Sequence, residues 1–116
     1  NHQWSEQLVT LYGTFSANRL DQQIQVCEKW LERHEESAAL HLTLGRLFIR
    51  SEVWGAAQHH LERSIELHPS SIAYQELAGL MKRNQDLSAA LYYFEQEVAL
   101  LRGEQHKTVT TPYLPN

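Results

Sequence analysis

The chain has 116 residues, of which 42% are apolar and 21% are charged, and its formal net charge is −4 at pH 7. This length suits one small domain with a modest core. The negative charge argues against a general binder of nucleic acids or membrane surfaces, and no apolar run is long enough to predict a membrane-spanning helix. The single cysteine, Cys27, excludes an internal disulfide framework. The chain starts at Asn1 without a signal-like segment, so we expect an excised or processed piece of a longer protein, with targeting information upstream.

The first predicted helical hairpin spans about residues 4–35. Apolar side chains recur at helical spacing along residues 4–15, and a second helix is expected to open at Asn18 or Asp21. Cys27 lies on the apolar stripe of that second helix, so we expect a buried and inert thiol. The other members of this stripe are Ile24, Trp30 and Leu31.

The second predicted hairpin spans residues 37–69. Ser37 can cap its first helix, and the apolar stripe of that helix breaks near Ser51 and Glu52. The second helix of the hairpin stops at Pro69, because proline cannot continue a helix. The two apolar stripes consist of Leu40, Leu44, Leu47 and Phe48, and then of Trp54, Ala57, Leu61, Ile65 and Leu67.

The third predicted hairpin spans residues 71–102. It starts after Ser70 or Ser71, turns near Asn84 and continues into a last helix for which Asp86 is a natural N-cap. We expect the polar tail, residues 104–116, to be a frayed or extended terminus. The two apolar stripes of this hairpin consist of Tyr74, Leu77, Ala78 and Met81, and then of Leu87, Ala90, Leu91, Phe94, Val98 and Leu101.

The second and third hairpins match each other when the chain is shifted by 33 residues. Gly45 and Ala57 lie 12 residues apart, and so do their counterparts Ala78 and Ala90. Small residues at these positions predict a close crossing between the two helices of each hairpin. Further matched pairs are Leu44 with Leu77, Leu47 with Leu80, Leu61 with Phe94, Glu62 with Glu95 and Ile65 with Val98.

These positions resemble the tetratricopeptide pattern of Leu, Gly, an aromatic residue, Ala, a large apolar residue and Pro. Ser64 departs from the pattern, which has alanine there, and Arg102 stands where proline is usual. The resemblance implies an all-α domain over residues 1–103, in which about three antiparallel hairpins stack as a short right-handed solenoid. The matching residues are Leu44, Gly45, Phe48, Ala57, Leu61 and Pro69, followed by Tyr74, Leu77, Ala78, Met81, Ala90 and Phe94.

A narrower resemblance runs from about residue 12 to residue 101. Residues 27–34 (CEKWLERH), 44–47 (LGRL) and 53–57 (VWGAA) are similar to elements of the C-terminal repeats of the HemY family. That resemblance implies a bacterial inner-membrane protein associated with haem biosynthesis, whose two membrane-spanning segments lie upstream of a repeat domain on the cytoplasmic side. The unrelated flavin-dependent protoporphyrinogen oxidase of the same name is excluded, because no Gly-x-Gly-x-x-Gly element is present.

The tetratricopeptide pattern also implies which residues line the concave face. Those positions are Ala39, Leu42, Arg46, Ile49 and Arg50 in the second hairpin, and Ile72, Gln75, Gly79, Lys82 and Arg83 in the third. We therefore expect Arg46, Arg50, Lys82 and Arg83 to point into one groove, where Gln75, Leu42 and Ile49 add polar and apolar contacts. Such a groove suits a carboxylate-bearing partner, since arginine holds a carboxylate in two hydrogen bonds. The alternative is a set of solvated charges that balance nearby glutamates.

The seven histidines do not follow a metal-binding pattern. His59 and His60 are adjacent and diverge by about 100° on a helix, while His34 and His41 are expected on different helices. Ordinary surface histidines are therefore the favoured interpretation, and neither a metal nor a cofactor is predicted. The HemY resemblance keeps haem contact open without naming a ligand.

The sequence predicts a binding protein rather than an enzyme, because no set of nucleophile, base and orienting group can be assembled. The leading hypothesis is a scaffold that resembles HemY and organises proteins of late haem biosynthesis at the inner membrane. One alternative is a haem or porphyrin carrier with a basic groove for the propionates. Another is a repeat domain from an unrelated assembly or secretion apparatus.

Overall fold

The computed structural model describes Glu6 and residues 19–103 of the chain. The described residues form an all-α structure without strands, which confirms the predicted fold class for this part of the chain. The expected first helix near residues 4–15 and the tail of residues 104–116 lie outside the described residues, apart from Glu6. The helices are Leu20–Leu31 (α2), Ala38–Arg50 (α3), Trp54–Leu67 (α4), Ser71–Arg83 (α5) and Leu87–Leu101 (α6).

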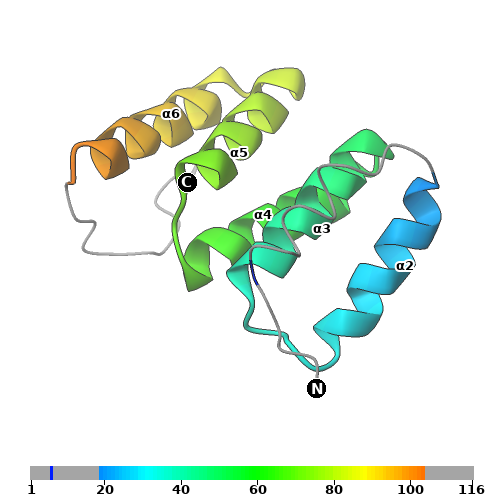
Figure 1. Cartoon of the computed structure of the whole chain (residues 1–116). Helices are drawn as coiled ribbons and strands as arrows, with labels where there is room; N and C mark the ends of the chain where they lie inside the picture. Colours follow the sequence, from blue (N-terminus) through cyan, green and yellow to red (C-terminus); the bar gives the residue numbers. More distant parts are fainter. Residues whose placement is uncertain (1–5, 7–18, 104–116) are drawn as a thin grey trace.

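Each helix packs against the next one along the chain, so the helices form a row with α2 at one end and α6 at the other (Figure 1). Three residues join α3 to α4, and three join α5 to α6, so each pair is an antiparallel hairpin. The middle residues of these two turns, Glu52 and Gln85, have positive φ angles of 61° and 64°. They are 33 residues apart, so the internal repeat extends to the backbone of the turns. In the described part of the chain, every helix is too short or too polar to cross a lipid bilayer.

Side-chain caps set the starts of three helices, because the first N–H groups of a helix have no partner within it. Ser37 accepts a hydrogen bond from the N–H of Leu40, at 3.0 Å, and Ser70 caps α5 in the same way. Asp86 accepts one from the N–H of Ala89, at 3.1 Å. The predicted caps Ser37 and Asp86 are confirmed.

Helix α2 starts differently from the sequence prediction. Its N-cap residue is Arg19, which has a left-handed backbone conformation and no side-chain cap. The carbonyl of Arg19 accepts hydrogen bonds from the N–H groups of Gln22 and Gln23, both at 3.1 Å. Asp21 therefore lies inside the first turn, where its negative charge interacts favourably with the helix dipole. The other predicted cap, Asn18, lies outside the described residues.

The core of the described residues consists of two clusters, and Phe48 packs against both. One cluster joins α2 to α3, and a second joins α3 and α4 to α5 and α6. Gly45 lies at the α3–α4 crossing, where a Cβ atom would stand 2.6 Å from Cγ of Leu61 and 3.4 Å from the carbonyl oxygen of Ala57. Gly45 thus meets Ala57 as the spacing predicted, although Leu61 makes the tighter contact. The fully buried large side chains are Leu40, Leu44, Leu47, Leu61 and Leu77.

Candidate binding face on helices α3 and α5

An ion pair between Arg46 and Glu76 connects α3 directly to α5. Nε of Arg46 lies 3.2 Å from a carboxylate oxygen of Glu76, and about a quarter of each side chain is exposed, 29% and 28% respectively. Sequence reasoning missed Glu76, although the residue lies on one helical line with Ile72, Gly79 and Arg83. We call the surface that carries this pair the α3–α5 face. It consists of Arg46, Arg50, Ile72, Glu76, Gly79 and Arg83.

Arg83 lies at the end of α5, where it covers the start of α4. Its guanidinium carbon is 4.4 Å from the centre of the Trp54 ring, which is a cation–π contact. Arg50 is exposed at the end of α3, four residues before Trp54, the first residue of α4. The ends of α3 and α5 are thus basic, while the acidic side chain of Glu76 lies further along the same face.

Gln75 and Lys82 lie on a different line of α5 from this face. The side-chain amide of Gln75 donates a hydrogen bond to Glu97 of α6, so Gln75 faces α6 rather than α3. Lys82 is exposed and lies seven residues further on, which is two turns along the same line. The hydrogen bond places Gln75 beside α6, and the sharing of one groove by Lys82, Gln75 and Arg46 stays a prediction.

The two apolar residues predicted for the groove belong largely to the core. Leu42 is only 7% exposed and lies in the cluster with Ala57 and Leu77, and Ile49 packs partly against the same cluster. Leu42 is largely buried because α5 covers the α3–α4 hairpin, and its role as an apolar contact for a partner stays a prediction. The exposed apolar residue on the α3–α5 face is Ile72, at 41%.

Gly79 leaves open space in the α3–α5 face. A Cβ atom built there meets no atom of another described element within 4 Å. This residue is exposed and lies one turn beyond Glu76. The face therefore has room for a ligand group beside the Arg46–Glu76 pair.

A pocket of about 480 Å³ lies where the start of α3 meets the end of α4 and the start of α5. Leu42 and Leu67 are among its apolar lining residues. On its polar side, Oε1 of Glu6 accepts hydrogen bonds from Oγ of Ser37, at 2.8 Å, and from the N–H of Ala39, at 3.1 Å. The donors at the start of α3 thus already hold a carboxylate of this chain, so an acidic ligand would have to displace Glu6.

Two histidines contradict the expectation of ordinary surface side chains. His41 is 5% exposed and stacks on His60 of α4, and their Nδ1 atoms are 3.0 Å apart. Burial lowers the pKa of His41, and it lowers the pKa of His60 to about 4. Phe48 stacks on the other partner of the pair, His60, almost in parallel. Helical periodicity assigns His41 and His60 to two separate helices. It does not predict that their rings meet, because this contact depends on how α3 packs against α4.

The described residues contain no group of three or more potential metal ligands. Comparison with models of known families, with curated proteins and with solved structures gave no match for this chain.

Proposed function

We propose that this chain is a tetratricopeptide-type stack of helical hairpins that binds a protein partner through the α3–α5 face. Repeat proteins of this kind use the surface formed by successive repeats, since no single hairpin offers a large site. The observation that carries the proposal is the Arg46–Glu76 ion pair, which brings equivalent helices of two successive hairpins together.

The favoured ligand is an acidic segment of the partner. Glu76 engages Nε of Arg46 in this ion pair, and a guanidinium carries four further N–H donors. Glu76 can hold the guanidinium of Arg46 in place while a carboxylate of the ligand accepts hydrogen bonds from the remaining N–H groups. Arg50 and Arg83 lie towards the basic end of the same face, and the open surface at Gly79 leaves space between α3 and Arg83.

The resemblance to HemY suggests which partner to test first. We propose that the acidic segment belongs to an enzyme of late haem biosynthesis and that the full-length protein acts at the bacterial inner membrane. A haem carrier is the competing hypothesis, and it predicts that haemin shifts its absorbance on mixing with the chain.

The test compares wild type with the double variant Arg46→Glu and Arg50→Glu. Late haem-biosynthesis enzymes are captured from a bacterial lysate and identified by mass spectrometry. We expect the double variant to keep its helical circular dichroism and to lose the captured enzymes. Capture by the wild type should also weaken with added salt, because charges near solvent are screened over about 8 Å at physiological ionic strength.

A matched control reverses Lys29 and Arg33, which are exposed and also four residues apart. This control has the same net charge as the double variant, so it separates the local face from overall charge. A second variant, Gly79→Leu, adds bulk to the face without adding charge, and we expect it to weaken capture as well. Equal capture by wild type and by Arg46→Glu with Arg50→Glu would contradict the proposal.

A further inference from the structure

The outer face of α6 carries most of the exposed apolar surface in the described part of the chain. Five of the eight exposed large hydrophobic residues belong to this one helix. They recur at alternating intervals of four and three residues, so they form one continuous stripe along the helix. We call them the α6 stripe: Leu87 (66% exposed), Leu91 (58%), Phe94 (42%), Val98 (47%) and Leu101 (69%).

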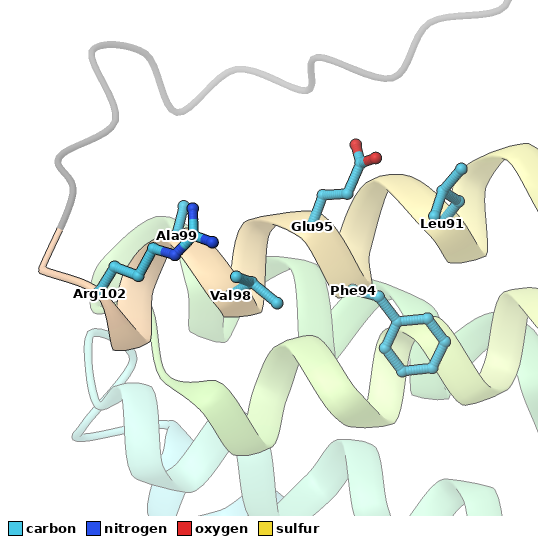
Figure 2. A pocket seen from close by; sticks show the side chains of 6 residues that line it. All are labelled: Leu91, Phe94, Glu95, Val98, Ala99 and Arg102. Atoms are coloured by element: carbon cyan, nitrogen blue, oxygen red, sulfur yellow. The ribbon is translucent and has the colours of Figure 1, made fainter.

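A shallow pocket of about 350 Å³ lies along this stripe. Figure 2 shows its lining side chains, which come from α6 and from Arg102, the residue that follows it, with Leu91 and Val98 separated by nearly two turns. The buried residues of α6, Ala89 and Ala90, belong to the core cluster that includes residues of α5, and none of the five stripe residues belongs to it. The stripe therefore contributes little to the core of the described residues, and its exposure leaves apolar surface in contact with water.

The internal repeat shows what kind of element covers such a stripe. Thirty-three residues before Phe94 stands Leu61, which is fully buried in the cluster that α5 shares with α4. Ile65 stands in the same relation to Val98 and packs against that cluster. The surface of α4 that carries Leu61 and Ile65 is thus covered by the amphipathic helix α5. The apolar side of α5 consists of small and medium side chains such as Ala73 and Leu77.

The charges of α6 favour a foreign helix over a second copy of this chain. Helix α6 contains two glutamates, Glu95 and Glu97, and neither lysine nor arginine. In an antiparallel α6–α6 pair centred on Phe94, Glu95 of one copy would lie beside Glu95 of the other, and like charges repel. A helix that presents lysine or arginine beside Glu95 would instead gain a favourable pairing.

We propose that the α6 stripe is a docking site for an amphipathic helix of a partner protein. The partner helix packs against α6 as α5 packs against α4. Its Ala and Leu side chains contact the α6 stripe, and one of its basic side chains lies beside Glu95. The site is on α6, the helix at the end of the row (Figure 1), and it shares no residue with the α3–α5 face, so both sites can be occupied together.

The test uses the full chain and a labelled peptide with the sequence of residues 70–84, which contains α5, its cap Ser70 and the basic residues Lys82 and Arg83. The peptide is held helical by a side-chain bridge, because isolated helices of this length are marginal in water. Fluorescence anisotropy measures its binding. We expect the double variant Leu91→Glu with Val98→Glu to weaken binding by about tenfold or more, since it places charges on the apolar seat.

The matched control changes two exposed valines outside α6, Val26→Glu with Val53→Glu. It has the same charge as the stripe variant, and we expect its affinity to stay within about twofold of wild type. Glu95→Lys should weaken binding, and a peptide with Lys82 and Arg83 changed to glutamate should bind this variant better than it binds wild type.

Three results would overturn the proposal. One is the absence of saturable peptide binding, and another is equal binding by wild type and the stripe variant. The third comes from sedimentation of the chain alone. If wild type forms a dimer that the stripe variant does not form, then the occupant of the stripe is a second copy rather than a foreign helix.

Discussion

The Nδ1 atom of His41 lies 3.0 Å from the Nδ1 atom of His60, across the crossing of α3 and α4. The other ring nitrogen of His41, Nε2, lies 3.0 Å from the carbonyl oxygen of Glu35. A carbonyl can only accept, so Nε2 of His41 carries the proton and Nδ1 of the neutral ring accepts. His60 must then donate from its own Nδ1, which assigns one tautomer to each ring.

This arrangement predicts that the protein loses stability in mild acid. Protonation of His41 would add an N–H at its Nδ1 that faces the N–H of His60, and protonation of His60 would place a charge on a ring that is largely buried. The pKa of His60 falls from an ordinary 6.5 to about 4, because of burial and the nearby rings of His41 and His59. The pKa of His41 is lowered mainly by burial and to a lesser extent by Arg63 and His59, whereas the hydrogen bond to the Glu35 carbonyl and the charge of Glu66 oppose this shift. The unfolded chain therefore binds more protons between about pH 6.5 and 4, and the free energy of unfolding should fall as the pH falls through that window.

The measurement is urea unfolding at a series of pH values for wild type and for His60→Asn. The amide nitrogen of asparagine can replace Nδ1 as a donor but does not titrate. We expect the variant to show a shallower loss of stability below pH 6.5. The exposed His68 at the end of α4 provides the control, His68→Asn, which should follow wild type. Identical pH profiles for wild type and His60→Asn would rule out His60 as the titrating group.

Two glycines should respond with opposite signs to the same substitution. Gly45→Ala would place a Cβ atom 2.6 Å from Cγ of Leu61, so the α3–α4 crossing must open or the leucine must move. We expect a loss of about 1–3 kcal/mol in the free energy of unfolding. Gly79→Ala meets open space inside α5, so it should stabilise the protein by about 0.5–1 kcal/mol through helix propensity. Thermal or urea unfolding measures both. A neutral or stabilising effect of Gly45→Ala would show that the crossing is looser than described.

Cys27 should be almost inert towards thiol reagents in the folded protein. Its side chain is fully buried between α2 and α3, and burial together with Glu28 raises the pKa of the thiol to about 11. The thiolate is the reactive form, so little of it exists near pH 8. A maleimide should label the unfolded chain rapidly in urea and the native protein only at the rate of opening. Fast labelling of the native protein would mean that α2 separates readily from α3.

The caps of α3 and α5 should differ in their contribution to stability. Ser37 and Ser70 cap their helices in the same way, but the hydroxyl of Ser37 also donates to Glu6. Replacing either serine by alanine should cost about 0.5–2 kcal/mol. We expect Ser37→Ala to be the more harmful change, because it also breaks the hydrogen bond to Glu6. In a Glu6→Ala background that difference should shrink, and an unchanged difference would argue against the Glu6 contact.

Local patterns in the sequence were sufficient to predict helices α3 to α6 and the side-chain caps at two of their starts, but not the start of α2. Apolar spacing of three and four residues identified α3 to α6, and Ser37 and Asp86 marked two starts by their capping chemistry. The pair Gly45 and Ala57 indicated the α3–α4 crossing, because only small side chains let two helices approach closely. These predictions depend on contacts within one hairpin, so they needed no knowledge of the rest of the molecule.

Only the tertiary structure decided what each helix face meets. Helical periodicity states which residues share a line, but it does not state which neighbouring helix covers that line. Gln75 faces Glu97 because α6 packs beside it, and Arg46 meets Glu76 because α5 lies against the preceding hairpin. Leu42 became core for the same reason. The pairing of His41 with His60 likewise depends on the rotation of α4 against α3, a property of packing that no local pattern contains.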